Sequence, residues 1–199
     1  MKIAIVKEEA ALTSVWAGGI GKQYFIFPNS ASFAARDFSI RLSMAIATSD
    51  EDAKFTPLYN ITRHLIVLEG TSTISHKGHY DIVMHPYDQI DVFDGGWETF
   101  GKGKITDFNM QLDKNVHGKM SVVDKNKTVV VGGYCETCHN PYNTTAFFCG
   151  HGSSIFNFST EESLRISKGD LLLIEDVPSD IYATIELLDS KLVRMDWCS

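Results

Sequence analysis

The chain has 199 residues, of which 44% are apolar and 22% charged, a composition that is typical of a globular protein and excludes a disordered one. Its net charge of -7 argues against nucleic acid and anionic membrane surfaces as partners, because both require a basic patch. The apolar residues before Lys7 are too few for a signal peptide, and no stretch approaches the ~20 apolar residues of a membrane-spanning helix. We therefore expect a cytoplasmic protein whose four cysteines are reduced.

Taken in chain order, almost every segment has the composition of a strand that is bounded by turn residues. Residues 30–35 have the composition of a helical turn, and nothing periodic supports a longer helix. The expected strands are residues 22–27, 38–47, 64–75, 81–84, 89–93 and 105–112.

Two of these strands carry polar side chains on one face. Side chains alternate along a strand, so Asp107, Asn109 and Gln111 share one face of the strand at 105–112. In the strand at 38–47, the same alternation brings Arg41 and Ser43 together on the less apolar face. Such a face is either the wet outside of a sheet or the inside of a ligand-binding barrel, and the alternation alone leaves both open.

An internal repeat relates the two halves of the chain. With an offset of 82, residues 67–74 match 149–156, and residues 85–92 match 167–174. Each copy contains a strand, a turn and a strand, and then a turn that ends in Asp before an apolar strand. The repeat predicts an all-β protein of two antiparallel barrels or jelly rolls. The expected boundaries are 1–115 and 116–199, with the N-terminal segment as a candidate strand of the second barrel.

Four potential zinc ligands are spaced as two pairs, Cys135 with Cys138 and Cys149 with His151. Zinc binds thiolate and imidazole ligands tetrahedrally, and such a site would brace the second barrel. The alternative is that the cysteines are free and packed as small apolar residues, as we expect for Cys198. Haem attachment to the Cys-x-x-Cys-His pattern would need export, and a redox dithiol would need a helix start; the sequence indicates neither.

Five motifs occur in order along the first half of the chain: Trp16-x-Gly18-Gly19, Phe38-x-x-Arg41-Leu42-Ser43-x-Ala45, Arg63-x-Leu65-x-Val67-Leu68-Glu69-Gly70, Phe93-Asp94-Gly95 and Asp107-Phe108-Asn109. In this combination the sequence resembles the HutD family, also called Ves, whose members are small bicupin proteins linked to bacterial histidine utilisation. Where that family tends to have Trp, Met and a basic pair, this chain has Ile40, Gln111 and Leu112-Asp113. One wall of the pocket is therefore expected to differ.

The resemblance implies a non-catalytic protein that binds a small acidic metabolite in the first barrel, with formylglutamate as the family's proposed ligand. Such a protein would modulate histidine utilisation or related amino-acid metabolism. Arg41 and Arg63 lie in the matched strands, and a guanidinium binds a carboxylate through two parallel hydrogen bonds. The other candidate ligand-binding residues are Ser43, Asp107 and Asn109 as polar contacts and Phe38, Phe93 and Trp97 as an apolar wall. The alternative is that Arg41 and Asp107 form a structural ion pair.

Two other functions remain open at the level of the sequence: a metal-dependent cupin enzyme that acts on a small acid or sugar, and a zinc-braced structural or interaction protein. Cupin barrels often hold a metal on two closely spaced His residues and a Glu, and this chain has no His-x-His. We expect His76 and His79 in a solvated hairpin tip, and His64 on the face opposite Arg63. The pattern assigns no catalytic residue and indicates no oligomeric state.

Overall fold

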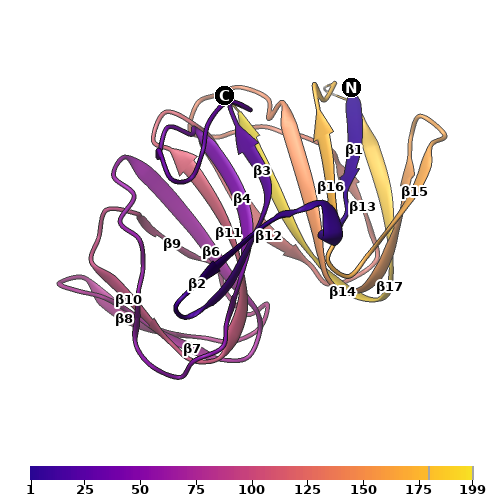
Figure 1. The fold of residues 1–199 in the computed structure, drawn as a ribbon. Helices are drawn as coiled ribbons and strands as arrows, with labels where there is room; N and C mark the ends of the chain where they lie inside the picture. Colours follow the sequence, from indigo (N-terminus) through magenta and orange to yellow (C-terminus); the bar gives the residue numbers. More distant parts are fainter. Residues whose placement is uncertain (179, 199) are drawn as a thin grey trace. The chain divides into compact units, whose positions relative to one another are not determined.

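The computed structural model describes residues 1–178 and 180–198, which form seventeen strands and one short 3-10 helix (Figure 1). The described part of the chain is therefore nearly all-β, and its strands pair antiparallel, as the sequence predicts. The chain divides into two compact units. The central unit is Ala11–Asn115, and the terminal unit combines Met1–Ala10 with Val116–Ser199. Within the described residues, no helix has the length and apolar character needed to cross a bilayer.

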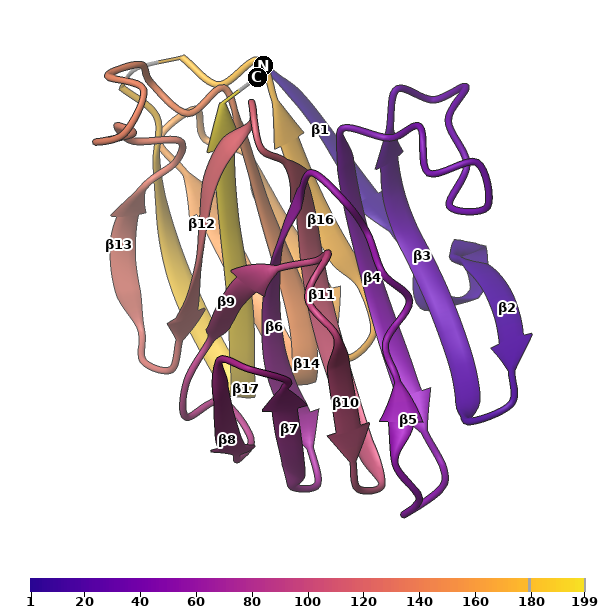
Figure 2. The same cartoon turned by 90° about the vertical axis from the view of Figure 1, so that its left-hand side faces the viewer.

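The central unit contains two antiparallel sheets (Figure 2). The six-stranded sheet has the order β2-β3-β4-β11-β6-β9, and the four-stranded sheet has the order β5-β10-β7-β8. The strands of the larger sheet are β2 (Leu12–Trp16), β3 (Gly19–Phe27), β4 (Ile40–Ala47), β6 (Ile61–Glu69), β9 (Asp91–Asp94) and β11 (Ile105–Asp113). Those of the smaller sheet are β5 (Ala53–Lys54), β7 (Ser72–His76), β8 (Tyr80–Met84) and β10 (Thr99–Lys102). A buried cluster that includes Leu65, Ile74 and Phe93 draws its side chains from both sheets.

The terminal unit contains one seven-stranded sheet with the path β1-β16-β14-β17-β12, to which β13 and β15 are attached through β17 and β14. Its elements are β1 (Lys2–Val6), η1 (Glu8–Ala10), β12 (His117–Val123), β13 (Lys127–Val130), β14 (Thr144–Phe158), β15 (Ser163–Ser167), β16 (Leu171–Glu175) and β17 (Tyr182–Cys198). The N-terminal strand β1 pairs with β16, and a buried cluster that includes Phe147, Phe156 and Leu192 forms the core.

The sequence repeat has a structural counterpart in the two units. The hairpin β7–β8 has the same register as β14–β15 when the numbering is moved by 82 residues. In the central unit, the N–H of Tyr87 donates to the carbonyl oxygen of Val67 at 2.9 Å. In the terminal unit, the N–H of Gly169 donates to the carbonyl oxygen of Cys149 at 2.8 Å, at the same offset. The two halves therefore share a backbone arrangement as well as a sequence pattern.

The strand expected at 64–75 is divided into β6 and β7, and Gly70 shows why. Gly70 has a φ of 82°, which side-chain-bearing residues rarely adopt. A Cβ at this position would lie 2.2 Å from the carbonyl oxygen of Lys104. The chain therefore turns here, and its next strand joins the smaller sheet.

Candidate ligand-binding site

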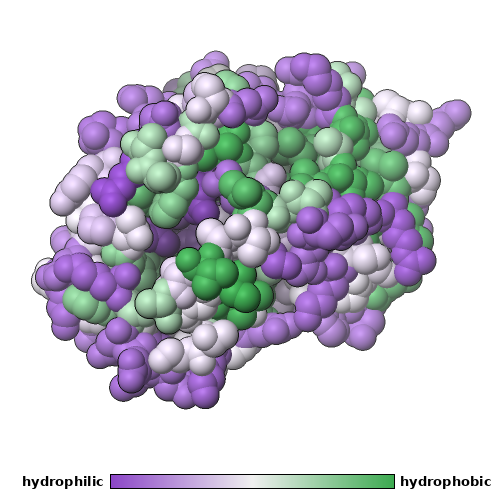
Figure 3. Space-filling model, in the orientation of Figure 1, coloured by the Kyte–Doolittle hydropathy of each residue, from purple (hydrophilic) through white to green (hydrophobic). Residues whose placement is uncertain are grey.

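A cavity of about 400 Å³ lies in the central unit, between residues of the larger sheet and residues from the smaller sheet and its loops. This volume falls in the range that small-molecule sites occupy. Figure 3 shows a hollow on the face of this unit with hydrophilic residues inside it and hydrophobic residues at its rim. The deepest polar groups come from three neighbouring strands, β4, β11 and β6.

Strand register explains why these polar groups meet. Gln111 in β11 is the register partner of Arg41 in β4 and of Arg63 in β6. Two residues earlier in β11, Asn109 pairs with Ser43 in the same way. Directly paired residues on neighbouring strands project to the same face of a sheet. The alternation seen in the sequence therefore becomes a continuous polar surface that faces the cavity.

Arg41 is held by neutral partners. Its Nε donates to Oε1 of Gln23 at 2.8 Å, and one terminal nitrogen donates to Oγ of Ser43 at 2.8 Å and to Oε1 of Gln111 at 3.1 Å. The guanidinium also lies 4.2 Å from the ring centre of Phe33. Burial, with a smaller contribution from the charge of Arg63, lowers the pKa of Arg41 to about 10. Arg41 therefore carries a positive charge at neutral pH without a carboxylate among these partners.

Arg63 is buried and makes fewer hydrogen bonds than Arg41. One terminal nitrogen donates to Oδ1 of Asn109 at 2.9 Å, and the guanidinium lies 4.8 Å from the ring centre of Phe55 and 5.3 Å from that of Phe93. Its Nε is buried and has no hydrogen-bond partner within residues 1–178 and 180–198. Burial lowers the pKa of Arg63 to about 10, although the charges of Asp107 and Asp91 oppose that shift. A buried donor without an acceptor is costly, so this nitrogen marks a position where a ligand oxygen would be stabilised.

Asp107 is the buried carboxylate of this polar surface. The side-chain amide of Asn109 donates a hydrogen bond to its Oδ1. Burial raises the pKa of Asp107 to about 7, and the charge of Arg63 and the hydrogen bond from Asn109 only partly oppose the shift. Among the buried side chains that line the cavity, two guanidiniums therefore face one partly ionised carboxylate at neutral pH. The net positive charge of this surface suits an anionic ligand.

Comparison with known proteins identifies the family. A family model described as HutD matches residues 8–187, which is most of the chain. The chain belongs to the HutD family. A search of curated proteins found no match.

Solved structures share the fold of this HutD family member. PA5104 from Pseudomonas aeruginosa PAO1 is 16% identical with a TM-score of 0.83, and HutD from Pseudomonas fluorescens SBW25 is 16% identical with a TM-score of 0.76. Each of these matches covers 100% of both chains. A cupin 2 conserved barrel domain protein from Leptotrichia buccalis is 11% identical with a TM-score of 0.57, over 98% of this chain and 97% of the other. These likenesses show a cupin-type fold.

Five of the eight predicted ligand-binding residues line the cavity of this HutD family member: Arg41, Ser43, Arg63, Asp107 and Asn109. The predicted polar strands thus come together on one face. Gln111 was not among the predicted ligand-binding residues, because it differs from the Met that the family tends to have. It lines the same cavity and accepts a hydrogen bond from Arg41. Its place on the Asp107 face of the alternating strand was the signal for it.

The predicted aromatic wall differs from the observed one. Phe38 precedes β4, packs with Leu58 and Ile61, and stacks on Phe33 with ring centres 6.3 Å apart. Phe93 lies beneath Arg63, and Trp97 stacks on His79 with ring centres 3.6 Å apart. None of these three aromatic residues lines the cavity.

The aromatic residues that line it instead are Trp16, from the first of the matched motifs, and Phe33 and Phe55, from outside the motifs. Gly101 leaves room for Phe55, because a Cβ there would lie 2.8 Å from its ring. The short β5 that precedes Phe55 had no strand signal in the sequence, and Phe33 lies in a turn-rich segment.

The structural ion pair considered for Arg41 and Asp107 does not form between these two described residues. The hydrogen-bond partners of Arg41 are Gln23, Ser43 and Gln111, and the bond to Asp107 comes from Asn109. Register explains the difference, because Asp107 pairs with Ala45, four residues along β4 from Arg41.

The expectation of a solvated hairpin tip is wrong for His76, whose side chain is buried. Its Nε2 lies 2.9 Å from Oδ2 of Asp91, and its Nδ1 lies 2.9 Å from Oγ1 of Thr99. The hydroxyl of Tyr80 donates to Oδ1 of Asp91 at 2.7 Å. Strand pairing across the smaller sheet places Thr99 opposite His76, which the hairpin sequence alone did not reveal.

His64 projects from β6 to the face opposite Arg63, as the alternation of side chains along a strand predicts. Burial lowers the pKa of His64 to about 4, so the imidazole is neutral at physiological pH.

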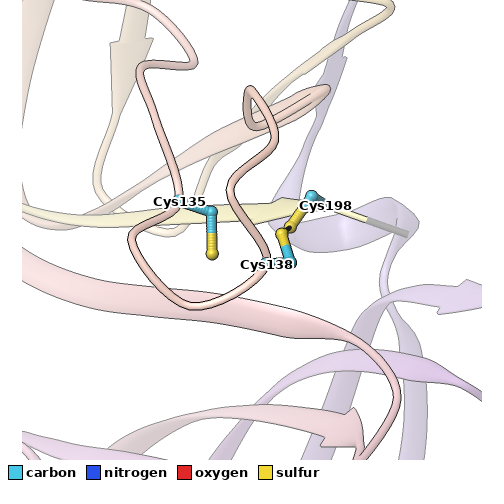
Figure 4. Close-up of side chains that lie close together, drawn as sticks. All are labelled: Cys135, Cys138 and Cys198. Carbon is cyan, nitrogen blue, oxygen red and sulfur yellow. Dashed lines mark hydrogen bonds between the residues drawn. The ribbon is translucent and has the colours of Figure 1, made fainter.

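The expected zinc ligand set needs a correction. Cys149 packs in the core of the terminal unit, where its thiol donates to the carbonyl oxygen of His151, and burial raises its pKa to about 11. The ligand atoms of Cys135 and Cys138 instead lie within 4.8 Å of that of Cys198 (Figure 4). Within the described residues, this is the one group of three or more His, Cys, Asp or Glu side chains that is spaced to hold a metal ion.

Proposed function

We propose that the cavity of the central unit binds a small acidic metabolite that carries a carboxylate and a formamide or amide group, as formylglutamate does. The protein would bind this ligand without converting it and would thereby modulate histidine utilisation or related amino-acid metabolism. The observation that carries the proposal is the unpaired, buried Nε of Arg63 beside a second buried guanidinium, that of Arg41.

The arrangement of donors and acceptors matches such a ligand. A ligand carboxylate that accepts from Arg63 would satisfy the free Nε and reduce the repulsion between the two guanidiniums. Asp107, Asn109 and Gln111 offer oxygens that can accept the N–H of a formamide. The rings of Phe33 and Phe55 would cover the methylene groups between the two polar ends.

The contacts of Ser43 favour binding over covalent catalysis at this residue. A serine nucleophile needs a neighbouring base to take its proton. The Oγ of Ser43 instead accepts a hydrogen bond from Arg41, which is a cation and cannot act as that base. Ser43 therefore serves to orient the guanidinium.

Calorimetric titration of the purified protein with N-formyl-L-glutamate tests the proposal. We expect saturable binding, weaker binding of L-glutamate, which lacks the formyl group, and an unchanged NMR spectrum of the recovered ligand. At a ligand concentration of about 100 Kd, the free energy of unfolding should rise by about 2.7 kcal/mol.

The matched variants are Arg63→Met and the control Arg165→Met, which removes an exposed arginine in the terminal unit. Loss of binding in the first variant alone supports the proposed pocket. If the wild-type protein binds neither N-formyl-L-glutamate nor related N-acylated amino acids, or if it hydrolyses them, the proposal is wrong.

A further inference from the structure

The three clustered cysteines belong to segments that are distant in sequence and adjacent in the terminal unit. Cys135 and Cys138 lie in the loop between β13 and β14, and Cys198 ends β17. Thr144, the first residue of β14, is the register partner of Trp197 in β17. The loop that precedes Thr144 therefore lies next to Cys198, which follows Trp197. Figure 4 shows Cys135 and Cys138 of this loop beside Cys198.

The loop is folded tightly around the first cysteine. The N–H of Cys135 donates to the carbonyl oxygen of Asn140 at 2.9 Å, and the N–H of His139 donates to the carbonyl oxygen of Cys135 at 3.0 Å. These two backbone hydrogen bonds close a compact loop that holds Cys138 close to Cys135.

The sulfurs are too close to one another to be independent thiols. The Sγ atoms of Cys138 and Cys198 are 2.7 Å apart, which is inside the contact distance of two non-bonded sulfur atoms. The third sulfur, that of Cys135, lies within 4.8 Å of both. Three convergent sulfurs at this spacing, in a small buried cluster, can act together as ligands of one cation.

We infer that Cys135, Cys138 and Cys198 bind one zinc ion as thiolates. A Zn–S distance of about 2.3 Å in tetrahedral geometry separates the sulfurs by roughly 3.8 Å, so Cys138 and Cys198 move apart slightly when the ion enters. Each thiol releases its proton to solvent on binding. The fourth position is left for a water molecule or an added donor.

This site joins the loop before β14 to the last described residue of β17. It uses the Cys-x-x-Cys pair that the sequence singled out, but its third ligand is the C-terminal cysteine, and Cys149 takes no part. The three cysteines share no residue with the lining of the cavity in the central unit.

Metal analysis of the fully reduced protein tests the inference. After addition of zinc and gel filtration, we expect one equivalent of zinc to remain bound, and Co²⁺ in its place should give the intense near-ultraviolet absorption of cobalt–thiolate bonds. Competition with a chromophoric chelator should show that Cys135→Ser, Cys138→Ser and Cys198→Ser each weaken zinc binding by roughly tenfold or more. The control variant Cys149→Ala should bind zinc as the wild-type protein does.

A second measurement uses only the wild-type protein, so it does not depend on the folding of the variants. Alkylation followed by peptide mass spectrometry should show that zinc protects Cys135, Cys138 and Cys198, and that removal of zinc by a chelator exposes them. Absence of zinc uptake by the reduced protein overturns the inference. So does a Cys138–Cys198 disulfide that persists in excess thiol, or unchanged zinc affinity in the three serine variants.

Discussion

Arg41 and Arg63 lie on either side of one residue, Gln111, on the cavity face of the larger sheet. Neighbouring strands are about 4.8 Å apart, so only two strand spacings separate the backbones of these two cations. Two buried like charges at this distance repel each other, and the partly ionised Asp107 compensates incompletely. A bound anion would relieve this repulsion.

The shape of the Arg63 guanidinium should matter as much as its charge. Arg63→Lys keeps a positive charge but loses the planar fork that binds a carboxylate through two hydrogen bonds. We expect the affinity for N-formyl-L-glutamate to fall by about tenfold or more in calorimetry. Arg165→Lys, at an exposed position of β15, should leave the affinity unchanged. Equal affinity in Arg63→Lys and the wild-type protein would show that this guanidinium does not contact the ligand.

The pKa of Asp107 predicts a pH dependence of stability. Burial raises this pKa from 3.8 to about 7, so the folded protein retains a proton that the unfolded chain has lost between these pH values. The free energy of unfolding should therefore fall as pH rises from about 4 to about 7, by up to about 4 kcal/mol from this group. Urea unfolding of the wild-type protein and Asp107→Asn at pH 5 and pH 8 measures the effect. The variant should lose less stability over this interval, and parallel profiles would contradict the prediction.

The buried pair of His76 and Asp91 should depend on Tyr80. Tyr80→Phe removes the hydroxyl that donates to Oδ1 of Asp91 at 2.7 Å and leaves the ring in place. Because Tyr80 is partly exposed, we expect a loss of about 1 kcal/mol in the free energy of unfolding. Tyr59→Phe is the control, since Tyr59 is 72% exposed. A similar change in both variants would show that the hydrogen bond to Asp91 contributes little.

Two ion pairs of the terminal unit should differ in their effect on stability. The Nζ of Lys7 lies 2.7 Å from Oδ2 of Asp170, whose side chain is only 6% exposed. Lys7→Met leaves this buried carboxylate without its counter-ion and should lower the free energy of unfolding by about 1–2 kcal/mol. Lys2→Met breaks the fully exposed pair with Asp176 and should cause no measurable change. Chemical denaturation compares the two, and equal effects would contradict the argument from burial.

Alternation and repetition are local properties of the chain, and they determined much of this protein. The period of two predicted that Asp107 and Asn109 share one face of their strand, and that Arg41 and Ser43 share one face of theirs. In the structure these two faces form one surface that lines the cavity. The offset of 82 residues predicted a common structural unit, which the matching hairpin registers confirm. The sequence motifs pointed to the HutD family, which the family model confirms. Each of these inferences depends on side-chain direction or on order along the chain, which the sequence records directly.

Contacts across strands and from loops were decided by the tertiary structure alone. Pairing of β4, β11 and β6 placed Arg41 and Arg63 beside Gln111, and no pattern within one strand specifies its partner's register. Loop packing brought Phe33 to the cavity in place of Phe38. The pairing of β14 with β17 brought Cys198 to Cys135 and left Cys149 in the core. Spacing along the chain therefore predicted that Cys135 and Cys138 lie together, and the tertiary structure placed Cys198 beside them in place of Cys149.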